Sequence, residues 1–191
     1  MISHLNGRLV EKNPTQIVVE CGGVGYAVRI SLNAFSQIGN DENIKILTQL
    51  QVREDAHVLY GFYSVKEREM FNHLISVSGI GANTAMLMLS SLTSDEIATA
   101  ILSENVALIQ SIKGIGSKTA QRVILDLKDK VAKSDFSTGN IFKANNTNQN
   151  DALTALLALG FEKKKAEKAI EKVAMDNQTV EQLIKEALKV L

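Results

Sequence analysis

The sequence predicts an α+β chain of three parts: a five-stranded barrel over residues 1–63, a helical domain over 64–133 and a three-helix domain over 150–191. Short runs of β-branched and aromatic residues recur up to position 63, and a helical spacing of apolar residues replaces them from Lys66. A polar stretch, 134–149, then separates the last two parts, and its composition favours a flexible linker. These three observations predict the fold class.

The overall composition describes a globular protein. Of 191 residues, 45% are hydrophobic and 22% are charged, with 21 Lys and Arg against 21 Asp and Glu. Because Cys21 is the single cysteine and the three histidines lack the spacing of metal ligands, we expect no disulfide, metal or cofactor. No run approaches the roughly 18–20 apolar residues of a membrane span, and the polar N-terminus is unlike a signal peptide. We therefore expect a soluble, cytoplasmic protein without a membrane partner.

The first part has the strand spacing of a small barrel. Five short strands in about 60 residues, separated by turn residues, suit a closed barrel of the oligonucleotide-binding (OB) type better than an open sandwich. The expected strands cover residues 5–10, 16–20, 26–31, 44–52 and 57–63.

The next two parts are predicted to be helical. Helices are expected over residues 66–77, 82–91, from 94, 104–112 and up to 133. Thr93 with Glu96 forms a capping box that opens one helix, and Thr179 with Gln182 forms another that opens the last of three short helices. Gly160 is expected to end the first of those three.

An internal repeat suggests the function. Residues 79–85 read Gly-Ile-Gly-Ala-Asn-Thr-Ala and residues 114–120 read Gly-Ile-Gly-Ser-Lys-Thr-Ala, which predicts two helix-hairpin-helix units. The glycines allow a tight turn and leave the backbone N–H groups at the start of the next helix open to a phosphate. The predicted backbone-contacting residues are Gly79, Gly81, Gly114 and Gly116.

The second repeat also opens a basic stretch, because residues 112–133 carry six basic and two acidic side chains. Lys118 and Arg122 are four residues apart on one helix face and can reach phosphates beside the turn. Such contacts read no bases, so binding should be independent of sequence and sensitive to salt. The repeat is no ATP-binding loop, since Ser111 stands where the first glycine is needed; any ATP would be bound by a partner.

Several motifs resemble those of the RuvA family along the whole chain. They are Cys21–Tyr26, the pair Val52–Ala56 and Leu59–Phe62, both Gly-Ile-Gly hairpins, and Ala155–Phe161. The resemblance implies an OB barrel, a tandem hairpin domain and a mobile, UBA-like three-helix domain. It further implies a non-catalytic homotetramer, or an octamer, that holds a four-way (Holliday) DNA junction open in recombination and repair. The implied partners are the hexameric ATPase RuvB, recruited through the C-terminal domain, and the resolvase RuvC.

The resemblance also assigns roles to single residues. Residue types alone favour an ordinary acidic turn at Glu54 and Asp55; the resemblance reverses that interpretation and implies that they form an acidic pin at the junction centre. Asn83 and Ser117 stand at hairpin positions where the family often has basic residues. We therefore expect binding that relies on backbone N–H groups, with basic side chains at Lys118 and Arg122.

The C-terminal part has more leucines than one helix face can bury. Leu156, Leu159, Phe161 and Leu188 are candidates for an apolar surface that docks the partner, whereas Leu153 and Leu157 are expected in the core.

Two other functions remain open at this point. Lys118 occupies the position of the nucleophile in helix-hairpin-helix DNA glycosylases, but the nearest downstream acid outside its helix is Asp135, in the polar stretch. A general scaffold for single-stranded DNA would need a stacking platform, and the six Phe and three Tyr are too dispersed to suggest one.

Overall fold

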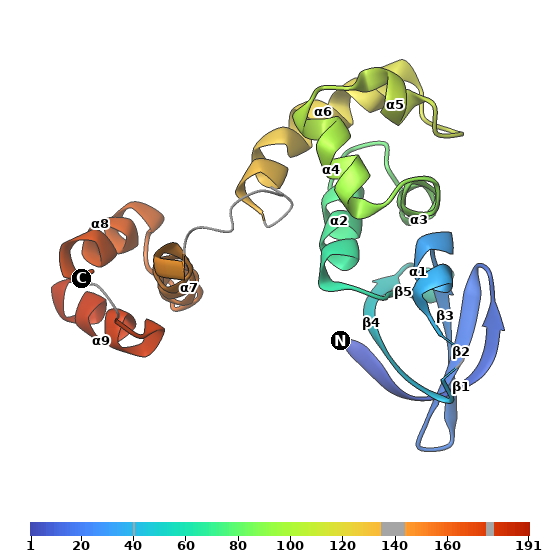
Figure 1. The fold of residues 1–191 in the computed structure, drawn as a ribbon, viewed down its shortest axis with the longest axis horizontal. Helices are drawn as coiled ribbons and strands as arrows, with labels where there is room; N and C mark the ends of the chain where they lie inside the picture. The colour runs from blue at the N-terminus through green and yellow to red at the C-terminus, as the bar shows by residue number, and fades with distance from the viewer. Residues whose placement is uncertain (40, 135–143, 175–177) are drawn as a thin grey trace. The chain divides into compact units, whose positions relative to one another are not determined.

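The computed structural model describes residues 1–39, 41–134, 144–174 and 178–191. The chain divides into two compact units, Met1–Thr138 and Gly139–Leu191, which are treated separately below (Figure 1). Within the described residues, no single helix is long and apolar enough to cross a membrane; two consecutive helices, Ala82–Ser91 and Ser94–Leu102, meet that criterion only jointly and are bent by 96° at their junction.

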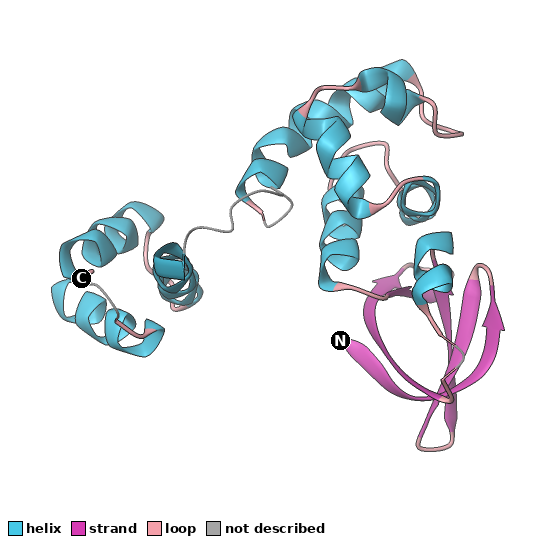
Figure 2. Cartoon of the chain, viewed as in Figure 1, coloured by secondary structure: helices cyan, strands magenta, loops and turns pink. Residues whose placement is uncertain are grey.

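The predicted barrel is confirmed as a closed five-stranded sheet with the strand order β1-β2-β3-β5-β4 (Figure 2). The β3–β5 pair is parallel and the other four pairs are antiparallel. The strands are β1 (His4–Asn13), β2 (Gln16–Cys21), β3 (Val24–Ile30), β4 (Asn43–Val52) and β5 (His57–Phe62).

Closure of the barrel depends on a glycine in β5. A Cβ added at Gly61 would lie 2.5 Å from Cγ1 of Val28, inside any allowed contact. Because Gly61 pairs with Ile30 in the parallel register, the absent side chain lets β5 approach β3 closely enough to close the sheet.

A short helix, α1 (Leu32–Gln37), follows β3 where the sequence predicted no element. Ser31, expected at the end of a strand, instead caps this helix by accepting a hydrogen bond from the backbone N–H of Ala34. Asn33 donates through Nδ2 to the carbonyl of Leu89, which fastens α1 to the helical domain.

The helical domain comprises α2 (Val65–Ile75), α3 (Ala82–Ser91), α4 (Ser94–Leu102), α5 (Val106–Gln110) and α6 (Ser117–Lys133). The capping box at Thr93 is confirmed. The rings of Tyr60 and Phe62 lie 5.2 and 4.9 Å from Phe71 of α2, so β5 and the helical domain share one apolar core. The barrel therefore serves as a fixed base for the helices.

The second unit holds α7 (Ala144–Ala158), α8 (Lys163–Val173) and α9 (Val180–Val190) around a small core. The capping box at Thr179 is confirmed, and Gly160 follows α7 with a φ of 94°. Helix α7 begins six residues before the expected domain start, because Ala144–Gln149 continue the helix instead of belonging to the predicted linker. The rest of that linker, 135–143, lies outside the described residues.

Candidate nucleic-acid interface

The two predicted hairpins have the same backbone geometry. Gly79 and Gly114 have φ angles of 95° and 88°, in the left-handed region that favours glycine. The next residue closes each turn: the N–H of Ile80 donates to Val77 at 3.0 Å, and the N–H of Ile115 donates to Ile112 at 3.1 Å. Because both isoleucine side chains are buried, each loop is anchored from inside while its glycines remain exposed.

Each hairpin leads into a helix whose first N–H groups are open. Gly81 and Gly116 are the N-cap residues of α3 and α6, and neither helix has a side-chain cap. The first helical bonds run from Ala85 to Gly81 and from Ala120 to Gly116, both at 2.9 Å. The preceding N–H groups of each helix therefore have no helical partner and lie at the positive end of its dipole.

No contact among the described residues explains why Gly81 and Gly116 are glycines. Their φ angles, −86° and −80°, suit any residue. A Cβ added at either position would meet no atom within 4 Å. The absence of a side chain at these two helix starts thus leaves room for something outside the chain.

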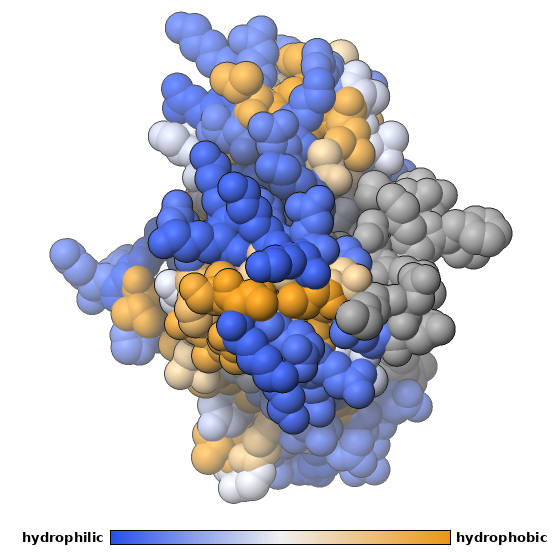
Figure 3. All heavy atoms as spheres, turned by 90° about the vertical axis from the view of Figure 1, so that its left-hand side faces the viewer, coloured by the Kyte–Doolittle hydropathy of each residue, from blue (hydrophilic) through white to orange (hydrophobic). Residues whose placement is uncertain are grey.

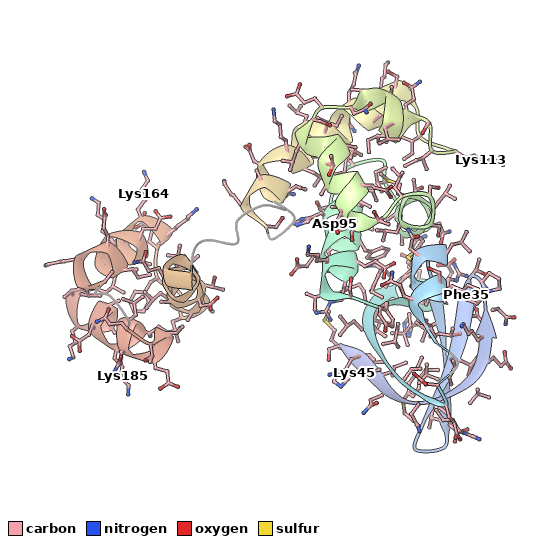
Figure 4. The ribbon with its side chains drawn as sticks, viewed as in Figure 1. Phe35, Lys45, Asp95, Lys113, Lys164 and Lys185 are labelled. Carbon is pink, nitrogen blue, oxygen red and sulfur yellow. The ribbon has the colours of Figure 1, made fainter. Side chains whose placement is uncertain are left out.

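Basic side chains lie around the hairpins. Lys118 is exposed on the first turn of α6, next to the exposed Ser117. Arg122 Nη1 lies 3.4 Å from the carbonyl oxygen of Ser78, in the loop of the first hairpin. Lys113 is exposed at the outer tip of the loop between α5 and α6 (Figure 4). Helix α6 therefore presents cations to both hairpins.

The acidic pair occupies the tip of the β4–β5 hairpin. Val52 and His57 form the last pair of the strands, and the N–H of Arg53 donates to the carbonyl of Ala56 at 2.9 Å, which closes the turn. Glu54 and Asp55 are exposed within it. Two carboxylates thus project from the barrel with no apolar cover.

Three family models match successive parts of the chain. The RuvA N-terminal domain family matches residues 1–61, the SAM-like helix-hairpin-helix tandem family matches 71–129, and the RuvA C-terminal domain family matches 147–191. The chain is 54% identical over 193 residues to a protein of Christiangramia forsetii, with 100% of each chain covered. The chain belongs to the RuvA family.

Two further relatives are similar over nearly the full length. The chain is 52% identical to a protein of Flavobacterium psychrophilum and 49% identical to one of Cytophaga hutchinsonii, with 99% of each chain covered in both cases. All three proteins are named Holliday junction branch migration complex subunit RuvA.

Within the region that matches the RuvA C-terminal domain, one of the predicted docking residues is buried and the other three are exposed. Leu156 is fully buried in the core of the three helices, so the expectation that it docks a partner was wrong. Leu159, Phe161 and Leu188 are exposed by 61%, 36% and 42%. Leu157, expected in the core, is 39% exposed, because it lies one position past Leu156 on α7 and faces outward. Figure 3 shows surface apolar residues gathered in patches between hydrophilic ones.

Among the described residues, no group of three or more His, Cys, Asp or Glu side chains could hold a metal ion. Lys118 is exposed on its helix, and Asp135, the acid considered as its partner, lies outside the described residues.

Glu67 positions the helical domain on the barrel. It is buried at the start of α2, where its carboxylate accepts hydrogen bonds from the hydroxyl of Ser31 and, at 3.0 Å, from the N–H of Tyr63. Burial raises the pKa of this carboxyl, against the opposing effect of the two hydrogen bonds. Because α2 ends at the first hairpin, these bonds help to set where that hairpin lies.

The structure also brings Arg29 of β3 to the first hairpin, where Asn83 accepts its hydrogen bond at 3.3 Å. Arg29 is absent from the residues that the sequence predicts for this site. No local pattern marks it, since Arg29 and Asn83 are 54 positions apart.

Proposed function

We propose that this chain binds four-way (Holliday) DNA junctions through their sugar–phosphate backbone and serves as a non-catalytic subunit of the branch migration complex. The names of the relatives, at up to 54% identity over the full chain, support the junction and the complex. The proposal assigns ATP hydrolysis to a partner, the RuvB motor.

The observation that carries the proposal is the pair of glycines at Gly81 and Gly116. Open space around both positions and ordinary φ angles mean that folding does not require glycine. A phosphate oxygen approaching the free N–H groups of α3 and α6 does require it, because a Cβ would stand in the way. Two such sites in each protomer would hold two points of a duplex arm.

The same geometry explains why binding would not depend on base sequence. N–H groups and cations directed at phosphates fix position and orientation but read no base edge. Affinity should therefore fall with salt, in proportion to the phosphates that Lys118, Arg122 and their neighbours neutralise.

The acidic turn would make the protein prefer a four-way junction over a continuous duplex. Glu54 and Asp55, exposed at the tip of the β4–β5 hairpin, repel phosphates and disfavour a continuous duplex lying across the barrel. At an open junction the strands diverge, so carboxylates at the centre cost little there. On this proposal the pair weakens total affinity and improves discrimination.

The proposal extends to partners. The exposed apolar residues Leu159, Phe161 and Leu188, together with Leu157, would form the surface that docks RuvB. We further propose a cytoplasmic homotetramer, or an octamer, because four protomers match the four arms of a junction, with RuvC as a further component of the complex.

A gel-shift competition tests the central claim. The full chain is titrated against a labelled four-way junction, with linear duplex of the same arm sequence or single strands as competitors, with and without magnesium. We expect the junction to be preferred and a junction of scrambled sequence to compete equally. Equal affinity for linear duplex would refute junction recognition. In a separate assay on damaged duplex, release of free base would support a glycosylase instead.

A further inference from the structure

The internal repeat has one mismatch that matters for charge. Lys118 is the second residue of α6, and the equivalent second residue of α3 is Asn83. Both helices start at an uncapped glycine with the same turn before it. The second hairpin therefore has a cation at the edge of its N–H groups, and the first has a neutral amide there.

The barrel brings a cation to that amide. Nη1 of Arg29 lies 3.3 Å from Oδ1 of Asn83, and the hydroxyl of Tyr60 donates to the same oxygen at 3.2 Å. Arg29 and Tyr60 are direct partners in the parallel β3–β5 pair, so the closed barrel places them side by side. Asn83, in the helical domain, thus accepts hydrogen bonds from two side chains of the barrel, Arg29 and Tyr60.

Arg29 keeps most of its binding capacity. A guanidinium has five N–H donors in a planar fork that suits phosphate, and the bond to Asn83 uses one of them. Among the described residues, no carboxylate forms an ion pair with Arg29, whereas Arg8 in the same barrel pairs with Glu20 at 3.0 Å. Arg29 is exposed, and with Tyr60 and Asn83 it lines a surface hollow of about 210 Å³.

We infer that Arg29 supplies the first hairpin with the cation that Lys118 supplies to the second, and that it binds a phosphodiester of the DNA backbone there. Asn83 and Tyr60 are positioning residues that hold the guanidinium beside the N–H groups of α3. This inference rests on the proposed DNA binding. It adds the barrel to the phosphate-binding surface and gives each hairpin a cation beside the first N–H groups of its helix.

The test compares four chains by junction affinity across a salt series. R29Q removes the cation, and R29Q/N83K returns a cation to the same hairpin from the helix side. R8Q removes an arginine of β1 that is paired with Glu20 of β2. We expect R29Q to bind roughly tenfold more weakly than wild type at low salt, as the removal of a charge-assisted hydrogen bond predicts. The slope of log affinity against log salt should fall by about 0.9 for each phosphate that the variant no longer neutralises.

The double variant should recover the wild-type salt slope, and R8Q should match wild type in both measurements. Tyrosine fluorescence during urea unfolding checks that every variant is folded, since all three tyrosines lie in the first unit. A loss of affinity in R29Q with an unchanged salt slope would overturn the inference, because Arg29 would then only hold the first hairpin in place and would not bind a phosphate. Equal behaviour of R29Q and R8Q would overturn it too. Failure of the proposed function looks different, because wild type itself would then show no preference for the junction.

Discussion

Arg122 and Ser78 connect the two hairpins: the guanidinium of Arg122, on the helix of the second, donates to the carbonyl oxygen of Ser78, in the loop of the first, at 3.4 Å. Lys130 adds a second link, since its Nζ lies 3.2 Å from the hydroxyl of Ser76. Because α6 follows directly from the second hairpin, one helix holds both turns. Their spacing is thus established before DNA is bound.

Removing this link should loosen the first hairpin. In R122Q we expect faster amide hydrogen exchange at Val77 and Ile80, by several-fold, because the loop loses its outer support while its inner bonds remain. Junction affinity should fall as well. Hydrogen exchange of the free protein measures the first effect. K118Q is the matched control, with weaker DNA binding and wild-type exchange in this loop; unchanged exchange in R122Q would show that the contact does not order the loop.

Serine at the two N-cap glycines should separate binding from folding. G81S and G116S are expected to change stability by only a few tenths of a kcal/mol, because serine caps helices as well as glycine does. Each should weaken junction binding by at least about tenfold, since the new side chain occupies the place of the phosphate and competes for its N–H groups. Thermal unfolding and gel shift measure the two effects. G39S, at an exposed glycine of the barrel, serves as control; wild-type affinity in G81S/G116S would contradict the proposed function.

Neutralising the acidic turn should raise affinity and reduce selectivity. In E54Q/D55N, two repelling charges disappear while the turn closed by Arg53 and Ala56 remains. We expect binding to linear duplex to strengthen more than binding to the junction, with the difference shrinking at high salt. Competition gel shifts at two salt concentrations measure this, with E11Q, at an exposed acid on β1, as control. A parallel gain for both DNAs in E54Q/D55N and E11Q would reduce the pair to an ordinary acidic turn.

The buried carboxyl of Glu67 should make the first unit less stable as pH rises. Its pKa is raised in the folded state, so the folded protein binds a proton more tightly than the unfolded chain does. That contribution is full below the unfolded pKa, near about 4.3, and is lost as pH rises through the raised folded pKa. E67Q does not titrate; its Oε1 can still accept from the N–H of Tyr63, while its amide nitrogen can donate to the Ser31 hydroxyl. In urea unfolding followed by tyrosine fluorescence, the free energy of unfolding of E67Q should therefore increase relative to that of wild type between pH 4 and pH 7. A difference between the two that does not change with pH would exclude this linkage.

Leu156 in α7 and Leu159, just past the end of that helix, should respond differently to truncation. L156A removes a fully buried side chain and should cost about 2–5 kcal/mol, enough to unfold a three-helix unit of this size. L159A alters a side chain that is 61% exposed and should change stability by less than about 0.5 kcal/mol. NMR spectra of the C-terminal amides distinguish the two. If the exposed surface docks RuvB, L159A should lose that binding while staying folded, and retained binding would place the docking surface elsewhere.

The sequence predicted the elements whose signals are local. The capping boxes at Thr93 and Thr179 are stretches of four residues, and both appear as expected. It missed α1, because Ser31 follows a strand pattern directly and a helix of six residues is too short to show an apolar period. It also extended the linker over Ala144–Gln149, since a polar composition carries no apolar period to reveal a helix.

The functional site likewise has features with local signals in the sequence and features that depend on packing. The sequence by itself determined the paired glycine turns, since φ angles near 90° and uncapped helix starts follow from neighbouring residues alone. Only the tertiary structure decided which of the C-terminal leucines is core, and only the closed barrel brought Arg29 to Asn83 across 54 positions. The physical reason is that hydrogen bonding within a turn involves adjacent residues, whereas burial and the meeting of distant side chains depend on how whole elements pack.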